Sequence, residues 1–140
     1  MSSSNNPDIV GRTGGNNFST GAVAKVKSVN LRSGGLIDSI QLVYSTNYLT
    51  AVYGGTGGAP SSFIVGTGDE VIIAVSVKSE KYVDGLQFRT NKGLFSPWFG
   101  GTGGGQTITF NAPPGTYLVG IQGRTGRYLD AFAPIWGTNP

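Results

Sequence analysis

The sequence contains an internal repeat with a period of 46 residues, and this period constrains the fold more than any other feature. Three of the five aspartates, Asp38, Asp84 and Asp130, are spaced 46 residues apart. In each copy a basic residue stands six positions before the aspartate, a hydroxyl residue five positions before it and an aliphatic residue directly before it, as in LRSGGLIDSI, VKSEKYVDGL and GRTGRYLDAF. Self-similarity at a fixed period marks a chain built from similar structural units. We therefore predict three related units.

A glycine-rich segment keeps the same period. YGGTGGAP at 53–60 and FGGTGGGQ at 99–106 lie 46 residues apart, and a shortened copy, GRTGGNNF, occupies 11–18. Asp38 precedes Gly58, the second glycine of the next pair, by 20 residues, and Asp84 precedes Gly104 by the same 20. An aspartate at a strand end can simply bond the amides of its own loop, and glycine pairs mark turns. Because a turn needs no distant partner, the constant separation favours a two-part site in which an aspartate faces a glycine pair.

The segments between these loops have the pattern of short β-strands. They are β-branched or alternating and are bounded by Gly, Pro, Asn and Ser, and no window of eleven or more residues keeps a helical apolar stripe. The segments are 23–31, 71–77, 86–88, 107–110 and 117–123. The chain of 140 residues is long enough for one core, and 38% of it is hydrophobic although 24 residues are glycine. We predict a single all-β domain at 11–140, after a polar tail at 1–10.

Missing residue types exclude several kinds of chemistry. The sequence has no cysteine and no histidine, which removes disulfides, thiolate nucleophiles, Ser-His-Asp catalysis and the commonest transition-metal ligand. The net charge is only +3 and the ten Lys and Arg are not gathered in runs, so no nucleic-acid partner is expected. No stretch approaches the roughly 20 apolar residues that cross a bilayer, so no membrane insertion is expected. The N-terminus does not have the pattern of a signal peptide. We expect a soluble protein without a cofactor, either cytoplasmic or released by a non-classical route.

The aspartate and the glycine pair together suit one class of ligand. Glycine reaches positive φ and has no β-carbon, so a GGTGG loop can place its backbone amides directly against a ligand. An ionised carboxylate on the opposite side accepts hydrogen bonds from two neighbouring hydroxyl groups, whereas it would repel a phosphate. The pattern therefore favours a neutral polyol, above all a pyranose sugar.

These residues resemble those of the jacalin-related lectins. The resemblance is carried by the G-x-x-x-D loops 34–38 and 126–130, the GGTGG loops and the segment RTNKGLFSPWFGGTGG at 89–104. The three-copy arrangement is most similar to the griffithsin-like, mannose-binding members. The resemblance implies a β-prism I of three four-stranded antiparallel sheets with pseudo-threefold symmetry, in which the first and last strands share a sheet.

The resemblance also implies three carbohydrate-binding sites, called here the Asp130, Asp38 and Asp84 sites. The carboxylate of Asp130 would accept hydrogen bonds from the sugar O4 and O6 hydroxyls, while amides of its own loop would donate to O5 and O6 and a glycine-pair amide to O3. The predicted binding residues of the three sites in turn are Gly15, Gly126, Arg127, Tyr128 and Asp130; Gly34, Gly35, Leu36, Asp38 and Gly58; and Lys81, Tyr82, Asp84 and Gly104. No catalytic residue and no metal ligand is implied.

The three sites differ in ways that predict a ranking. The tyrosines of the Asp130 and Asp84 sites can lay a ring beside a sugar, whereas Leu36 supplies only apolar contact. Glu80 stands where the motif has glycine. If this position needs a positive φ, a glutamate costs about 1 kcal/mol or more, and its charge also competes with the ligand for loop amides. We therefore rank the Asp130 site first, the Asp38 site second and the Asp84 site third.

The choice of sugar follows from the same resemblance. Galactose-specific members of the family rely on a free amino terminus cut beside the first glycine pair. Here Gly14 and Gly15 lie inside an uncut segment, so mannose or glucose is favoured. Single sugars should bind near the millimolar range, which is about 4 kcal/mol. Several sites on one rigid prism, multiplied again by any homodimer, would raise the avidity for clustered glycans.

Two other functions stay open at this point. Paired carboxylates hydrolyse glycosides, and the sequence has one pair of adjacent acids, Asp69 and Glu70. A single carboxylate in each repeated site cannot act as both acid and base, so we predict that the protein is not an enzyme. In the other alternative, the loops no longer bind sugar and the domain is a scaffold or a toxin-associated module.

Overall fold

The computed structural model of the chain describes residues 9–11 and 14–140, so most of the predicted tail and two residues of the first glycine loop lie outside the described residues. The described residues form twelve β-strands. In chain order the strands are β1 (Val10–Gly11), β2 (Asn16–Ser19), β3 (Val26–Ser33), β4 (Ile37–Tyr44), β5 (Tyr53–Gly54), β6 (Ala59–Ile64), β7 (Ile72–Ser79), β8 (Val83–Thr90), β9 (Phe99–Gly100), β10 (Thr107–Asn111), β11 (Tyr117–Thr125) and β12 (Leu129–Gly137). Over this part of the chain there is no helix long and apolar enough to cross a membrane.

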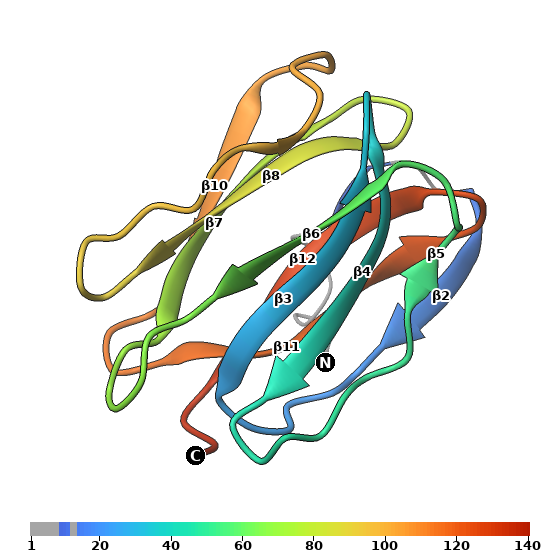
Figure 1. Cartoon of the computed structure of the whole chain (residues 1–140). Helices are drawn as coiled ribbons and strands as arrows, with labels where there is room; N and C mark the ends of the chain where they lie inside the picture. The colour runs from blue at the N-terminus through green and yellow to red at the C-terminus, as the bar shows by residue number, and fades with distance from the viewer. Residues whose placement is uncertain (1–8, 12–13) are drawn as a thin grey trace, which may run out of the picture.

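The strands form three four-stranded antiparallel sheets (Figure 1). Their strand orders are β1-β12-β11-β2, β5-β4-β3-β6 and β10-β7-β8-β9. The first and last strands of the chain share a sheet, because Val10 in β1 pairs with Phe132 in β12. This confirms the predicted all-β fold, a β-prism I built from three sheets.

The 46-residue period appears in the strand register. The central hairpins pair Leu31 with Ile40, Val77 with Leu86, and Gly123 with Phe132, and each of these pairs lies one period after the previous one. Each hairpin also has a register irregularity directly after the repeated basic residue, between the basic residue and the hydroxyl residue that follows it. The three units therefore fold alike down to the local geometry of their hairpin ends.

The core lies between the three sheets. The strands β4, β8 and β12 contact one another pairwise, so one central strand from each sheet reaches the middle of the prism. Along these strands, side chains at matching positions of the repeat have no exposure at all. They are Ile37, Val83 and Leu129, and Ile40, Leu86 and Phe132. Burial of an aliphatic residue at each strand start fixes the position of the aspartate that follows it.

Two buried hydroxyl groups hold the chain segments that lead into the second and third glycine loops. Thr50 and Ser96 lie one period apart, and both are buried. Each hydroxyl accepts a hydrogen bond from a central-strand N–H, at 3.0 Å from Leu42 and 2.9 Å from Phe88, and donates to the carbonyl of the next residue. The residue that matches Leu42 and Phe88 one period later is Pro134, which has no N–H and needs no such acceptor.

Candidate functional site

The three repeated aspartates lie at the same end of the prism. Each is the second residue of a central strand, β4, β8 or β12, directly after the turn of a hairpin. Figure 1 shows the three hairpin turns gathered at the upper right. The exposed fractions of Asp38, Asp84 and Asp130 are only 7%, 9% and 7%. Carboxylates buried to this degree are costly unless hydrogen-bond donors reach them.

A glycine pair from a separate loop covers each carboxylate. A β-carbon on Gly57 would come within 2.7 Å of Asp38 Oδ2, and one on Gly58 within 2.6 Å of Asp38 Oδ1. At the Asp130 site a β-carbon on Gly14, from the first glycine pair, would lie 3.3 Å from Asp130 Oδ2. The absence of side chains on these glycines is therefore what allows the backbone to approach the carboxylates.

The Asp84 site has the same arrangement. A β-carbon on Gly104 would overlap Asp84 Oδ2. The second glycines of the three pairs, Gly15, Gly58 and Gly104, all have positive φ, at 76°, 72° and 90°. This is a backbone conformation that residues with a side chain rarely adopt. Each of these positions therefore requires glycine for two reasons, the positive φ and the close approach of neighbouring atoms. The constant 20-residue separation thus identified residues that the fold brings together.

The hairpin turns before the aspartates share one conformation. The first N–H of the turn donates to the carbonyl two residues later, from Gly34 to Leu36 at 3.0 Å, from Glu80 to Tyr82 at 3.0 Å, and from Gly126 to its counterpart at 3.1 Å. None of these three first residues has a positive φ. A β-carbon on Gly34 would meet nothing within 4 Å. Glu80 therefore fits the turn without backbone strain, and the conformational cost that would follow from a positive φ does not arise.

The repeated basic residue holds the glycine pair from behind. The Arg32 guanidinium donates to the carbonyls of Gly57 and Gly58 at 3.0 Å and 2.8 Å. Arg124 makes the matching bonds to the first glycine pair, both at 2.8 Å. Lys78 makes a single bond of 3.3 Å to the Thr102 carbonyl. The sequence showed this basic residue in every unit, but its target was not predicted, because a long side chain can reach many groups.

This contact orients the loop amides. In a trans peptide the carbonyl and the following N–H point in opposite directions. A guanidinium that holds the Gly57 carbonyl therefore turns the Gly58 N–H the other way. Arg32 and Arg124 provide this orientation at the Asp38 and Asp130 sites, whereas the bond of Lys78 at the Asp84 site goes to the Thr102 carbonyl, one residue before the glycine pair.

The carboxylates differ in their electrostatic surroundings. Burial raises the pKa of Asp38 above its ordinary value, and the nearby Arg32 guanidinium partly offsets this rise. Burial also raises the pKa of Asp84, and the Glu80 carboxylate raises it further, against smaller lowering effects of the Glu80 N–H bond and of Lys78. Asp84 Oδ2 is buried and has no hydrogen-bond partner within the described residues. Buried polar atoms normally have partners, so this oxygen, which lies against Gly104, is an unsatisfied acceptor.

The third residue of each hairpin turn provides an apolar surface beside the carboxylate. Tyr82 and Tyr128 are half-buried, and their rings meet edge to face with centroids 4.9 Å apart. The Asp84 and Asp130 hairpin turns are therefore immediate neighbours. The matching residue of the second unit, Leu36, is also half-buried. The second residues of the turns, Gly35, Lys81 and Arg127, are exposed.

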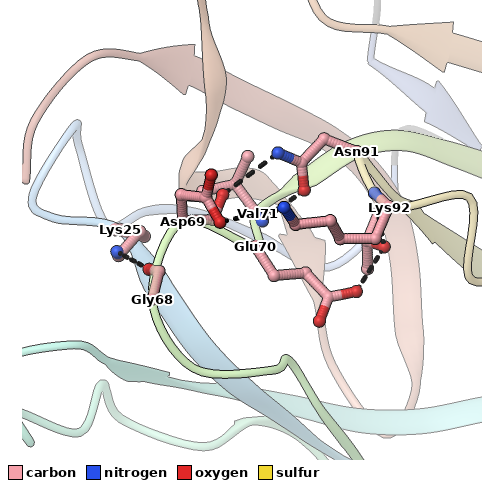
Figure 2. Close-up of polar contacts among 8 residues, drawn as sticks. Lys25, Gly68, Asp69, Glu70, Val71, Asn91 and Lys92 are labelled. Atoms are coloured by element: carbon pink, nitrogen blue, oxygen red, sulfur yellow. Dashed lines mark hydrogen bonds and ion pairs between the residues drawn. The ribbon is translucent and has the colours of Figure 1, made fainter.

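The adjacent acids Asp69 and Glu70 lie at the other end of the prism, before the start of β7. The Asp69 carboxylate pairs with Lys92 at 3.0 Å, and the Glu70 carboxylate accepts a hydrogen bond from Thr90 at 2.6 Å. Figure 2 shows these contacts, which tie the loop to the end of β8 and to the segment that follows it. In the described part of the chain no group of three or more acidic, His or Cys residues is placed to hold a metal ion.

Comparison with known proteins agrees with this architecture. The sequence model of the jacalin-like lectin domain matches residues 8–134. No curated protein sequence matches the chain. Similar solved structures include wild-type Malaysian banana lectin, with 25% identity, a TM-score of 0.80 and coverage of 94% of this chain and 96% of the lectin. The mannose-binding lectin from champedak has 22% identity, a TM-score of 0.82 and coverage of 92% and 93%. Artocarpin in its mannotriose complex has 21% identity, a TM-score of 0.81 and coverage of 92% and 94%. Because the family model spans nearly all of the chain and the fold agrees, the chain belongs to the family of jacalin-like lectin domains.

Proposed function

We propose that this lectin domain binds mannose- or glucose-type glycans at the Asp130, Asp38 and Asp84 sites, without a metal ion and without catalysis. The observation that carries the proposal is the threefold pairing of a buried aspartate carboxylate with a glycine pair from a separate loop. All three pairs lie at one end of the prism. A carboxylate that accepts two bonds, placed opposite backbone donors, matches neighbouring hydroxyls on a sugar ring.

In the proposed geometry the sugar lies between the hairpin turn and the glycine pair. At the Asp130 site the carboxylate accepts from O4 and O6, the amides of Arg127 and Tyr128 donate to O5 and O6, and the Gly15 amide donates to O3. The exposure of Arg127 and the half-burial of Tyr128 support this assignment, since the turn can contact a ligand on its outer side. The champedak lectin is described as mannose-binding and artocarpin is seen with mannotriose, which makes mannose the first sugar to test.

The ranking of the sites now rests on charge and loop fixation. Backbone strain does not weaken the Asp84 site, because Glu80 has an ordinary φ. Two features still place it last: Glu80 brings a second carboxylate close to Asp84, and the Lys78 bond to the glycine loop is longer than the arginine bonds of the other units. A sugar at this site meets a less firmly held loop and a less readily ionised acceptor.

A site-resolved titration tests the proposal. The full chain, labelled with ¹⁵N, is titrated with methyl α-mannoside, and the amide shifts of each hairpin turn report one site. Asp130→Asn keeps the size of the side chain but removes the charge. Hydrogen bonds to a charged group contribute about 1.5–3 kcal/mol each, so affinity at this site should fall about tenfold or more. Asp69→Asn, at the other end of the prism, is the matched control.

Three outcomes separate the alternatives. Loss confined to the Asp130 turn in Asp130→Asn, with Asp69→Asn unchanged, supports the proposal. Unchanged binding at that turn refutes the assignment of Asp130. Silence of the unsubstituted protein toward mannose, glucose and a wider glycan array favours a scaffold. Release of reducing ends from a mannan, if lost in Asp130→Asn, favours a hydrolase.

A further inference from the structure

Two glycines of the GGTGG loops, Gly55 and Gly101, lie between neighbouring candidate sites. Each is the second residue of its loop and they are one period apart. The Gly55 N–H donates to the Asp38 carbonyl at 2.8 Å, and the Gly101 N–H donates to the Asp84 carbonyl at the same distance. Each glycine is therefore bonded to the backbone of the aspartate in its own site.

The other side of each glycine packs on the hairpin turn of a different unit. A β-carbon on Gly55 would overlap the carbonyl oxygen of Arg127, in the Asp130 turn. A β-carbon on Gly101 would overlap the carbonyl oxygen of Gly35, in the Asp38 turn. Neither glycine has a positive φ. The need for glycine at these two positions therefore comes from contact with the neighbouring turn and not from backbone conformation.

The contacts involve the residues whose amides are proposed to donate to a sugar. The Arg127 carbonyl belongs to the peptide that continues to the Tyr128 amide, and the Gly35 carbonyl belongs to the peptide that continues to the Leu36 amide. Gly101 cannot easily retreat, because its N–H is bonded to Asp84 and its carbonyl accepts a bond of 2.7 Å from the Trp98 indole. A side chain added at Gly101 would therefore displace the neighbouring Asp38 turn.

We propose that Gly55 and Gly101 are positioning residues that couple adjacent sites: each lets the glycine loop of one site set the position of the ligand-facing peptide in the next. Gly55 connects the Asp38 site to the Asp130 site, and Gly101 connects the Asp84 site to the Asp38 site. The matching residue of the first loop is Arg12, which lies outside the described residues. This inference rests on the proposed sugar sites for its functional consequence, but the coupling itself is a property of the backbone.

The test compares Gly55→Ala and Gly101→Ala in the full ¹⁵N-labelled chain. In the absence of sugar, Gly55→Ala should shift the amides of the Asp130 turn most strongly, with smaller shifts in the Asp84 turn because the Tyr82 and Tyr128 rings are in contact. Gly101→Ala should shift the Asp38 turn and leave the Asp130 turn unchanged. On titration with methyl α-mannoside, affinity at the neighbouring site should fall about tenfold, the equivalent of one well-placed hydrogen bond. Gly105→Ala, in the same glycine-rich segment as Gly101, is the control, because its φ is not positive and its β-carbon would lie 3.6 Å from its nearest neighbour, the Ser79 carbonyl oxygen, which is an ordinary contact distance.

The opposite patterns in the two variants distinguish coupling from a general loss of stability. Equal perturbation of all three turns in either variant, or changes confined to the substituted loop, would overturn the inference. The same holds if Gly105→Ala disturbs the Asp38 turn as strongly as Gly101→Ala does. An unsubstituted protein that binds no mannose would overturn the proposed function instead, and the sugar-free shifts would still decide whether the sites are coupled.

Discussion

The buried hydroxyl of Ser96 offers a quantitative test of how the glycine loops are held. Ser96 lies in the segment between β8 and the third glycine loop, and its hydroxyl accepts a hydrogen bond from the buried Phe88 N–H at 2.9 Å. It also donates to the Pro97 carbonyl at 2.8 Å. Replacing it by alanine removes both bonds and leaves a central-strand N–H without its acceptor.

The expected cost follows from this unsatisfied donor. A buried donor that loses its partner costs about 1–3 kcal/mol, so we expect Ser96→Ala to lower the free energy of unfolding by about 2 kcal/mol. For a domain of this size 1 kcal/mol corresponds to about 4 °C in Tm, so Tm should fall by about 8 °C. Thr50 occupies the same place in the preceding unit. Ser96→Thr should therefore keep the hydroxyl and change the unfolding free energy by no more than about 0.5 kcal/mol.

Thermal and urea unfolding of the unsubstituted protein, Ser96→Ala and Ser96→Thr measure these differences. Ser62→Ala is the comparison for loss of an exposed hydroxyl, whose bond to Asn30 joins two side chains at the surface. If Ser96→Ala were no less stable than Ser62→Ala, the bond to Phe88 would not hold this segment. If Ser96→Thr were as unstable as Ser96→Ala, packing and not the hydroxyl would be responsible.

Two further predictions concern the charges at the sites. Because burial and Glu80 raise the folded-state pKa of Asp84 above its ordinary value of 3.8, the carboxyl group favours folding when protonated, and this contribution is lost as pH rises through the raised pKa. Asp84→Asn should therefore have a higher Tm than the unsubstituted protein at neutral pH, and this difference should vanish below the ordinary pKa of aspartate. Sugar binding at this site should weaken as pH falls through the raised pKa. A Tm that is the same in both proteins at all pH values would contradict the prediction. Arg32→Met removes both guanidinium bonds to the second glycine pair. Because these bonds are exposed, we expect the free energy of unfolding, measured in urea, to fall by about 1 kcal/mol or less. The affinity for sugar at the Asp38 site, measured by amide shifts, should fall several-fold. Full affinity in Arg32→Met would show that the loop keeps its orientation without the guanidinium.

Much of the fold and of the pairing within the sites could be predicted from the sequence, because both repeat with a fixed period. The 46-residue spacing predicted three equivalent units, and the structure has identical pairings at 31–40, 77–86 and 123–132. The 20-residue spacing predicted that Asp38 faces Gly58 and that Asp84 faces Gly104, and the fold brings both pairs together.

What the sequence could not supply is the reason for a particular glycine. Glycine is used for positive φ, as at Gly58, for close approach, as at Gly55, or without either demand, as at Gly34. One letter stands for all three cases. The question of whether Glu80 strains its turn could therefore be answered only by the backbone, which shows that the position belongs to the third case. The neighbours of Gly55 and Gly101 likewise come from other units and leave no signal in local sequence.

The order of the three sites then depends on residues around the carboxylate and not on the carboxylate itself. An aspartate, a glycine pair and a basic residue recur in every unit, so the proposed acceptor and the proposed backbone donors are the same at each site. Where the basic residue is Arg32, two bonds fix the glycine carbonyls and a cation offsets part of the rise in the pKa of Asp38. Where it is Lys78, a longer bond goes to the Thr102 carbonyl, one residue before the glycine pair, and Glu80 adds a second negative charge. A preorganised loop loses less entropy when a ligand binds. We therefore expect the Asp84 site to be the weakest of the three proposed sites, through two separate changes that leave its turn conformation intact.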